Sequence, residues 1–167
     1  MHVAKSWSKT LFQVRVTFPA PLEFAYRWLT DFSPRDASIT GDEYRRRILE
    51  RSPSRVVFED LATTPSGWSW LRNVVDLHPP DRWHLEAVGN SLDARADYRL
   101  IPRSPSRTEL VMKWRLRPGI LGGTVPPKAA IEASLRQVWG TYAKALYEDY
   151  RSLGQRKRKS PPRSSRS

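Results

Sequence analysis

Short turns divide the middle of the chain into six extended segments, and this division restricts the possible folds more than any other feature. The segments span roughly residues 44–51, 54–63, 67–78, 82–91, 94–103 and 107–117. The breaks carry residues that favour turns: SPS at 52–54, TPSG at 64–67, HPPD at 78–81 and SPS at 104–106. Strands joined by such short connections pair with their sequence neighbours, so we predict an antiparallel meander.

One more strand and two helices flank this meander. The segment LFQVRVTF at 11–18 alternates apolar and polar residues, which predicts a half-buried strand. Helical spacing begins at Pro21, with Glu23 in the first turn, and a polar loop follows over 33–42. Over 127–153 apolar residues recur every three or four positions, which predicts one amphipathic helix roughly 40 Å long.

The order strand, short helix, six antiparallel strands and long C-terminal helix resembles the helix-grip fold of the START-like, polyketide cyclase/dehydrase and lipid-transport superfamily. The segment FQVRVTFPAPLEFAYRWLTDF is similar to the opening of that fold, and the helix ending in ALYEDYRSL is similar to its close. The resemblance covers about residues 10–153. It implies an α+β fold in which a curved antiparallel sheet of about seven strands wraps around the C-terminal helix. It also implies an apolar cavity between them that holds a hydrophobic small molecule, although the ligand does not transfer between members.

Length and charge predict one domain with two extensions. A chain of 167 residues is long enough to bury one core. We expect an N-terminal extension over 1–9, a START-like helix-grip domain over 10–154 and a basic disordered tail over 155–167. The tail holds six of the 29 Lys and Arg residues and no acid. Such a tail can make weak, non-specific contacts with polyanions, or it can simply be solvated.

Most candidate ligand-binding residues come from strand faces on which aromatic and small side chains alternate with charged ones. Beside the aromatic residues, alanines at 87, 94 and 96 leave space for a void. A void of about 300 Å³ or more would favour ligand binding, and ordinary core packing is the alternative. The candidates on the last two strands and the C-terminal helix are Tyr98, Met112, Trp114, Val138, Trp139 and Tyr142.

The sequence does not decide which face of the strand at 67–77 points toward the core. One face carries Trp68, Trp70, Arg72, Val74 and Asp76, and the other carries Ser69, Leu71, Asn73, Val75 and Leu77. If the tryptophan face points inward, Trp68, Trp70, Arg72 and Asp76 join the ligand-binding candidates. The two charged residues would then need a partner or a ligand head group. Arg72 would be the preferred anchor for a ligand carboxylate, because its planar fork binds both oxygens.

The sequence shows no arrangement typical of a catalytic or metal site. The histidines, His2, His78 and His84, lack the spacing of metal ligands. The GILGG run at 119–123 lacks the ending of a phosphate-binding loop, and we interpret it as a loop at the cavity mouth. His84 and Glu86 share a strand face, which we interpret as solvent-facing rather than as an acid–base pair. We therefore assign no catalytic residue, metal or cofactor.

The residue types and segments that the sequence lacks limit the class of protein to which it can belong. The chain has no cysteine, which excludes disulfides and thiolate chemistry. It has no apolar run of about 18 residues and no signal-peptide pattern, so we expect a cytoplasmic protein without a transmembrane segment. Scarce Asn, Gln and Met with abundant Arg fit a thermophile, although GC-rich codon usage explains the arginines equally well.

Three functions follow from these observations. The first is binding or transport of a hydrophobic small molecule, such as a lipid or polyketide, in the implied cavity. The second is a cyclase/dehydrase-type enzyme, which requires a proton-moving group among Arg72, Asp76, Tyr98 and Tyr142. The third is binding of nucleic acid or another anionic partner through the tail and the YRRR segment at 44–47. The sequence leaves the oligomeric state open.

Overall fold

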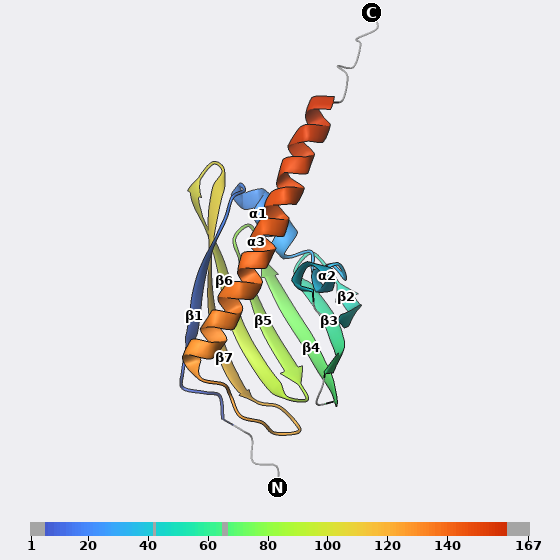
Figure 1. Cartoon of the computed structure of the whole chain (residues 1–167), viewed down its shortest axis with the longest axis vertical. Coiled ribbons are helices and arrows are strands. Elements are labelled where there is room, and N and C mark those ends of the chain that lie inside the picture. Colours follow the sequence, from blue (N-terminus) through green and yellow to red (C-terminus); the bar gives the residue numbers. More distant parts are fainter. Residues whose placement is uncertain (1–5, 42, 65–66, 160–167) are drawn as a thin grey trace, which may run out of the picture.

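A computed structural model of the chain, which describes residues 6–41, 43–64 and 67–159, consists of one sheet, one long helix and two short helices (Figure 1). The strands are β1 (Phe12–Phe18), β2 (Tyr44–Arg51), β3 (Arg55–Thr64), β4 (Gly67–His78), β5 (Arg82–Gly89), β6 (Leu92–Ser104) and β7 (Arg107–Pro118). The helices are α1 (Leu22–Leu29), α2 (Asp36–Thr40) and α3 (Lys128–Lys159). The short helix α2 lies in the segment expected to be a loop.

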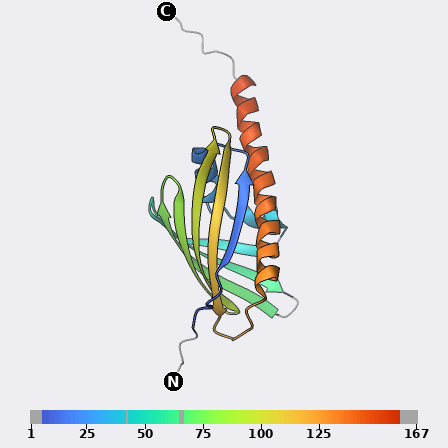
Figure 2. The ribbon, with the colours of Figure 1, turned by 90° about the vertical axis from the view of Figure 1, so that its left-hand side faces the viewer.

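The sheet has the order β1-β7-β6-β5-β4-β3-β2, and all neighbouring strands are antiparallel. Six strands therefore form the predicted meander, and β1 joins its far edge beside β7. The other edge is β2, where the pairing with β3 shifts at a bulge between Ile48 and Glu50. The sheet curves, and α3 lies along its concave side (Figure 2). The predicted fold class, a curved seven-stranded antiparallel sheet with a long C-terminal helix, is confirmed.

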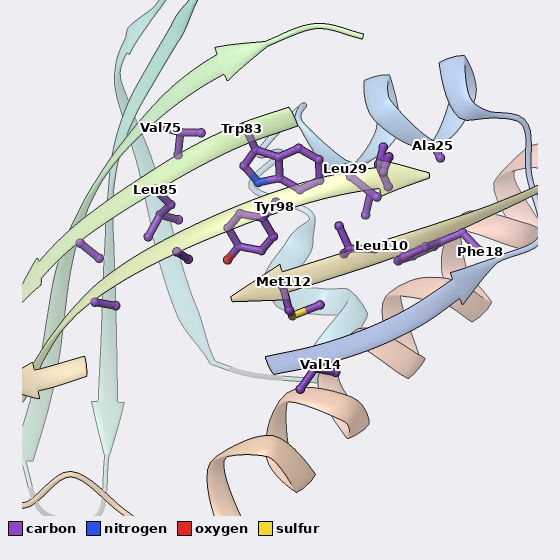
Figure 3. Packing of buried hydrophobic residues seen from close by; sticks show 14 of the residues in the cluster. Val14, Phe18, Ala25, Leu29, Val75, Trp83, Leu85, Tyr98, Leu110 and Met112 are labelled. Carbon is purple, nitrogen blue, oxygen red and sulfur yellow. The ribbon is translucent and has the colours of Figure 1, made fainter. Parts of the chain in front are cut away.

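The core lies on the concave face of the sheet, because alternate residues of each central strand point there. On β6 the residues at 94, 96, 98 and 100 are buried, while those at 95, 97 and 99 are exposed. Leu110 and Met112 on β7 lie against Val14 and Phe18 on β1, and Leu29 of α1 covers one end of this cluster (Figure 3). These residues form the most deeply buried part of the core, and we call this part the floor.

Helix α3 runs beside β1, and its last turns extend past the sheet (Figures 1 and 2). The Glu132 carboxylate accepts a hydrogen bond from the backbone N–H of Gln13 at 3.0 Å. Further along the helix, Asp149 accepts a hydrogen bond from Trp28 Nε1 at 2.8 Å and one from Arg35 at 2.5 Å. Polar contacts thus attach α3 at two points along its length. One attaches it to β1, and the other attaches it to α1 and to the loop that follows α1.

The structure describes part of each expected extension. The backbone N–H of Ser8 donates to the carbonyl of Leu116 at 2.9 Å, which attaches residues 6–9 to the end of β7. Helix α3 continues to Lys159, so the first five residues of the expected tail are helical. Residues 160–167 of that tail and residues 1–5 lie outside the described part of the chain. Within the described residues, no helix combines the length and apolar character needed to cross a membrane.

Candidate functional site

A cavity of about 210 Å³ lies between the concave face of the sheet and α3. It is partly open and smaller than the void of about 300 Å³ that we set as the size favouring ligand binding over ordinary core packing. The reason is that large rings fill much of the space under the helix. The aromatic residues that line it are Trp28, Phe32, Phe58, Trp83, Tyr98, Trp114, Trp139 and Tyr142.

Tyr98 on β6 is the centre of this aromatic lining. Its ring lies beside that of Trp83 (Figure 3). The two rings stack with their centroids 4.8 Å apart, and the Tyr98 ring also meets Trp114 at 6.0 Å and Trp139 at 5.8 Å. Trp139 in turn meets Tyr142 at 5.3 Å, so the ring cluster connects the sheet with α3. Burial raises the pKa of Tyr98, so its hydroxyl keeps its proton at any ordinary pH. The cluster forms a rigid apolar wall with hydroxyl groups set into it.

A buried ionic cluster forms the other end of the cavity. Arg46 on β2 has only 7% of its side chain exposed and holds both oxygens of Asp60 at 2.8 and 2.9 Å. It also donates to Asp36 of α2, and its guanidinium lies 4.2 Å over the ring of Phe58. Although burial opposes the charged form, hydrogen bonding and attraction from Asp60 raise the pKa of Arg46, so it remains a cation. The cluster attaches α2 to the edge of the sheet.

The two acids share one cation, and this imbalance affects Asp36. Burial raises the pKa of Asp36 to about 6, and the charge of Arg46 only partly offsets this effect. Burial also raises the pKa of Tyr44 to about 12, and the nearby hydroxyl of Tyr142 on α3 partly offsets this effect. The polar end therefore holds one carboxyl group that changes its protonation state near neutral pH, beside phenols that do not.

Two buried donors at the cavity have no hydrogen-bond partner among the described residues. These are Nδ2 of Asn73 on β4 and Nε1 of Trp114 on β7. Asn73 is only 3% exposed. A third unpartnered group, the hydroxyl of Tyr26, does not line the cavity. Buried donors usually have partners, and these two atoms have almost no accessible surface, so they do not face the open space of the cavity that their residues line.

Comparisons with known proteins identify the architecture. No family model and no curated protein matches this sequence. Among solved structures, a START superfamily protein from Mycobacterium smegmatis superposes with a TM-score of 0.65 at 14% identity, over 83% of this chain and 97% of that one. The chain has the START-like helix-grip fold.

Two further solved structures support the same fold. The Zhui aromatase/cyclase from Streptomyces sp. R1128 has a TM-score of 0.63 at 15% identity, and the match covers 93% of this chain and 98% of that one. The protein TTHA0849 from Thermus thermophilus has a TM-score of 0.68 at 11% identity, over 84% and 99% of the two chains. At these identities the likeness establishes the fold, and the resemblance stated from the sequence is confirmed.

The START-like frame brings half of the predicted site residues together. Tyr98, Trp114, Val138, Trp139 and Tyr142 all line the cavity. Met112 does not, because it is fully buried in the core behind the cavity wall.

The predicted residues on β4 lie elsewhere. The inward face of this strand is the one with Asn73 and Val75, which pair with buried residues on both neighbouring strands. Arg72 is exposed on the outer face, and Asp76 pairs there with Arg55 at 2.7 Å. The interpretation in which Trp68, Trp70, Arg72 and Asp76 enter the cavity is therefore corrected. The physical reason is that outward placement leaves both charges in water, where they need no buried partner.

The polar residues of the site were not among those predicted from the sequence. Arg46 was interpreted as one of three basic surface residues in YRRR, whereas Arg45 and Arg47 are exposed and Arg46 is buried. Its position between Tyr44 and Ile48 in the strand alternation is the signal that could have placed it inward. His84 bonds to Asp97 at 2.8 Å, beside Glu86, on the outer face, as the solvent-facing interpretation requires. No cluster of potential metal ligands occurs in the part of the chain that the structure describes.

Proposed function

We propose that the protein binds a small, largely apolar molecule in the cavity between the sheet and α3. The observation that supports this most is the aromatic lining, which contributes walls from β5, β6, β7 and α3 to one space. Ligand sites are concave and mainly apolar, with a few fixed polar groups, and this cavity has that composition. The contact residues of the proposal are Tyr98, Trp114, Val138, Trp139 and Tyr142.

The volume limits the size of the ligand. Sites for drug-sized molecules usually measure about 300–1,000 Å³, whereas a dry apolar cavity of about 150 Å³ accepts benzene. A cavity of about 210 Å³ falls between these values. We therefore expect a molecule with one or two rings, or one ring of a longer molecule whose remainder leaves through the opening.

The ionic cluster limits the charge of the ligand. Arg46 is already held by two carboxylates, so it has no free charge to offer a ligand carboxylate. One cation beside two acids leaves this end neutral or negative, according to the protonation state of Asp36. A neutral ligand fits this environment better than an anion, and this replaces the carboxylate anchor proposed for Arg72.

The proposal is tested by native mass spectrometry of the purified protein and by titration with one- and two-ring compounds followed by tryptophan fluorescence. Val138→Trp fills the cavity from α3, and Gln137→Trp adds the same group at its exposed neighbour as a matched control. We expect the first variant to lose binding and the second to bind like the wild type. Equal binding by both variants, or no binding by the wild type, contradicts the proposal.

A second candidate function is a cyclase/dehydrase-type reaction, and Asp36 is the observation that favours it. Its carboxyl group lines the cavity and has a pKa of about 6, which suits a general acid or base near neutral pH. The test is ring closure of a poly-β-ketone thioester analogue by the wild type and by Asp36→Asn. The enzyme hypothesis expects the variant to bind the analogue normally and to lose most of the acceleration. Without acceleration by the wild type, binding alone remains.

A weaker proposal concerns the basic surface. Arg45 and Arg47 are exposed on β2, and the basic segment 155–167 follows the body of α3. We expect at most a non-specific contact with polyanions that disappears as salt is raised from about 50 to about 200 mM, because released counterions drive such binding. Persistence of binding at high salt would show a specific interface instead.

A further inference from the structure

A groove of about 620 Å³ lies on the outer face of the sheet, which points away from α3. Outward residues of β1, β5, β6 and β7 form most of its lining. Its volume is in the usual range for a site that holds a complete small molecule, about 300–1,000 Å³. The lining contains the cationic residues Arg15, Arg82, Arg99 and Lys113, the histidines His78 and His84, and the acid Asp97.

The strand register places three of the arginines in one row across the sheet. Arg82 on β5 lies directly opposite Arg99 on β6. Arg99 pairs with Val111 on β7, and Val111 pairs with Arg15 on β1. Lys113 follows Val111 by two residues, so it lies on the same face in the next row. Directly opposite residues have Cβ atoms about 4.5–5.5 Å apart, so Arg82 and Arg99 can bind the same small anion.

The charges of Arg82 and Arg99 are only weakly compensated within the protein. Like charges on directly opposite residues repel each other. The carboxylate of Asp81 serves both arginines, at 3.5 Å from Arg82 and 4.0 Å from Arg99, and these distances are long for an ion pair. The two side chains are 66% and 65% exposed, so both can turn toward a ligand. One distant carboxylate therefore leaves room for a second anion between two guanidinium groups.

The rest of the groove keeps this excess of positive charge. Lys113 lies opposite Asp97, but the Asp97 carboxylate bonds to His84 at 2.8 Å, and Lys113 has no ion pair among the described residues. Glu109 binds Arg15 at 2.5 Å and is shared with a second arginine. With the histidines neutral, two positive charges remain. This difference is between six cations and four acids in the groove and its ion-pair network, namely Arg15, Arg82, Arg95, Arg99, Arg103 and Lys113 against Asp81, Glu86, Asp97 and Glu109.

Apolar side chains lie between the cationic groups. Val111 separates Arg99 from Arg15 in the row, and Ile101 follows Arg99 by two residues on the same face of β6. Both apolar side chains are half-buried in the groove lining. Guanidinium groups bind phosphate oxygens in pairs, and lysine binds phosphate as a point charge. A phosphate group held by the arginines would leave the organic part of its molecule over Val111 and Ile101.

We infer that this groove is a second binding site, for a small organic phosphate with two or more negative charges, such as a nucleoside diphosphate. Arg82, Arg99 and Lys113 bind the phosphate groups, while Val111 and Ile101 contact the organic part. The surplus of two positive charges favours such an ion over a carboxylic acid with a single charge. The site lies across the sheet from the cavity under α3, so it does not depend on the function proposed for that cavity.

The test is isothermal titration of the full chain with ADP, inorganic pyrophosphate and adenosine, in a phosphate-free buffer at about 50 mM salt. We expect ADP to bind at least about 10-fold more tightly than adenosine, because only ADP brings the phosphate groups. Pyrophosphate should bind more weakly than ADP, because it lacks the organic part. No binding of ADP, or equal binding of ADP and adenosine, overturns the inference. Equal binding of ADP and pyrophosphate overturns the role of Val111 and Ile101.

Three variants assign the binding to residues. Arg99→Gln and Lys113→Gln each remove one charge of the groove, and Arg72→Gln removes an exposed charge from the outer face of β4, outside the groove. The two groove variants should each weaken ADP binding by about 5- to 20-fold, whereas Arg72→Gln should change it by less than about 2-fold. Equal losses in all three variants would show a general effect of net charge and would overturn the assignment.

Thermal unfolding gives a readout that separates binding from a structural role. A ligand of the folded chain raises the midpoint of unfolding, so ADP should raise it for the wild type and much less for Arg99→Gln. Without ligand, Arg99→Gln should unfold at the same temperature as the wild type or higher, because it removes the repulsion with Arg82. A midpoint several degrees lower would show that Arg99 serves the fold and would contradict its role as a ligand contact.

A nucleic acid carries the same phosphate chemistry, and one further titration distinguishes this source. A single-stranded oligonucleotide of about 12 nucleotides spans a typical single-strand binding site. We expect any binding of it to be unchanged by Arg99→Gln and Lys113→Gln, because the groove accommodates a small molecule. If the oligonucleotide binds more tightly than ADP and both variants abolish this, the groove belongs to a nucleic-acid surface and the small-molecule inference is overturned.

Discussion

The sheet and the long helix of this molecule bury their side chains to very different degrees. Phe12 and Val14 on β1 and Leu110 and Met112 on β7 are at most 2% exposed. In α3, Leu146 is the one side chain with comparable burial among those described, while its other apolar residues remain half exposed. The molecule therefore combines a tightly packed floor on the sheet with a less deeply buried helix, α3, which covers the cavity.

The difference in burial gives the sheet and the helix different roles. The floor supplies most of the folding free energy and holds the aromatic wall in a fixed position. The cover closes the cavity with few buried contacts, so local opening on the α3 side requires less free energy than disruption of the floor. A ligand therefore has its easiest entry along α3, and substitutions on the two sides should have different consequences.

The largest effect is expected at the ionic cluster on the sheet side. Arg46→Met leaves Asp36 and Asp60 buried without their cation and should lower the free energy of unfolding by about 3–5 kcal/mol. Arg45→Met, at the exposed neighbour, should change it by less than about 0.5 kcal/mol. Urea denaturation of both variants measures the difference. Similar values for the two would mean that the cluster contributes nothing to stability.

The next prediction compares equal truncations on the two sides. Leu110→Ala in the floor should lower the free energy of unfolding by about 3–5 kcal/mol, because it leaves a cavity in a tightly packed region. Leu135→Ala, which is half-buried on α3, should lower it by about 1 kcal/mol. Denaturant unfolding with matched m-values checks this pair. A larger loss at Leu135 would reverse the assignment of floor and cover.

A third prediction uses pH at the junction between cover and sheet. Because burial raises the pKa of Asp36 from 3.8 to about 6, the folded protein takes up this proton more readily than the unfolded chain. The stabilising contribution is complete below the ordinary value and is lost as the pH rises through about 6.

Relative to Asp36→Asn, the wild type should therefore gain on the order of 2 kcal/mol of stability between about pH 7 and about pH 4. The pKa of Asp31 is also raised by burial, and its charge adds to the raised pKa of Asp36, so part of the difference between the two proteins reports this interaction. Denaturant unfolding at several pH values across this range measures the difference. A constant difference across the range is incompatible with a raised pKa at Asp36.

The smallest effect concerns the attachment of the cover. Trp28→Phe removes the hydrogen bond to Asp149 while keeping an aromatic ring against Tyr142. We expect a loss of about 1 kcal/mol in unfolding free energy and faster hydrogen exchange in the second half of α3. Faster exchange confined to the strands would place the effect in the floor instead.

The fold followed from the sequence because its signals are local. Turn residues and strand alternation placed all seven strands, and helical spacing placed α1 and α3. The boundary at Leu153 was too early, since the apolar pattern ends there while Lys and Arg continue the helix to Lys159. The five-residue helix α2 is too short to show a periodic pattern.

The site was only half predictable, because its polar members depend on pairing between strands. Both faces of β4 mix apolar and polar residues, so periodicity alone could not choose between them. The register decides: Asn73 lies between Phe58 of β3 and Ala87 of β5, on the face that holds the core. Likewise, the partners of Arg46 are contributed by β3 and α2, which no local pattern connects with it.

The exposed edge of the sheet at β2 affects how the protein behaves at high concentration. Unlike β1, which α3 accompanies, the edge strand β2 presents unpaired backbone groups, and such edges invite another molecule to add a strand. Its bulge at Ile48 and Glu50 interrupts the regular pairing surface, and the outward charges of Arg45 and Arg47 repel the same edge of a second molecule. These features protect the chain from edge-to-edge aggregation, so replacing both arginines with threonine should promote it without altering the cavity.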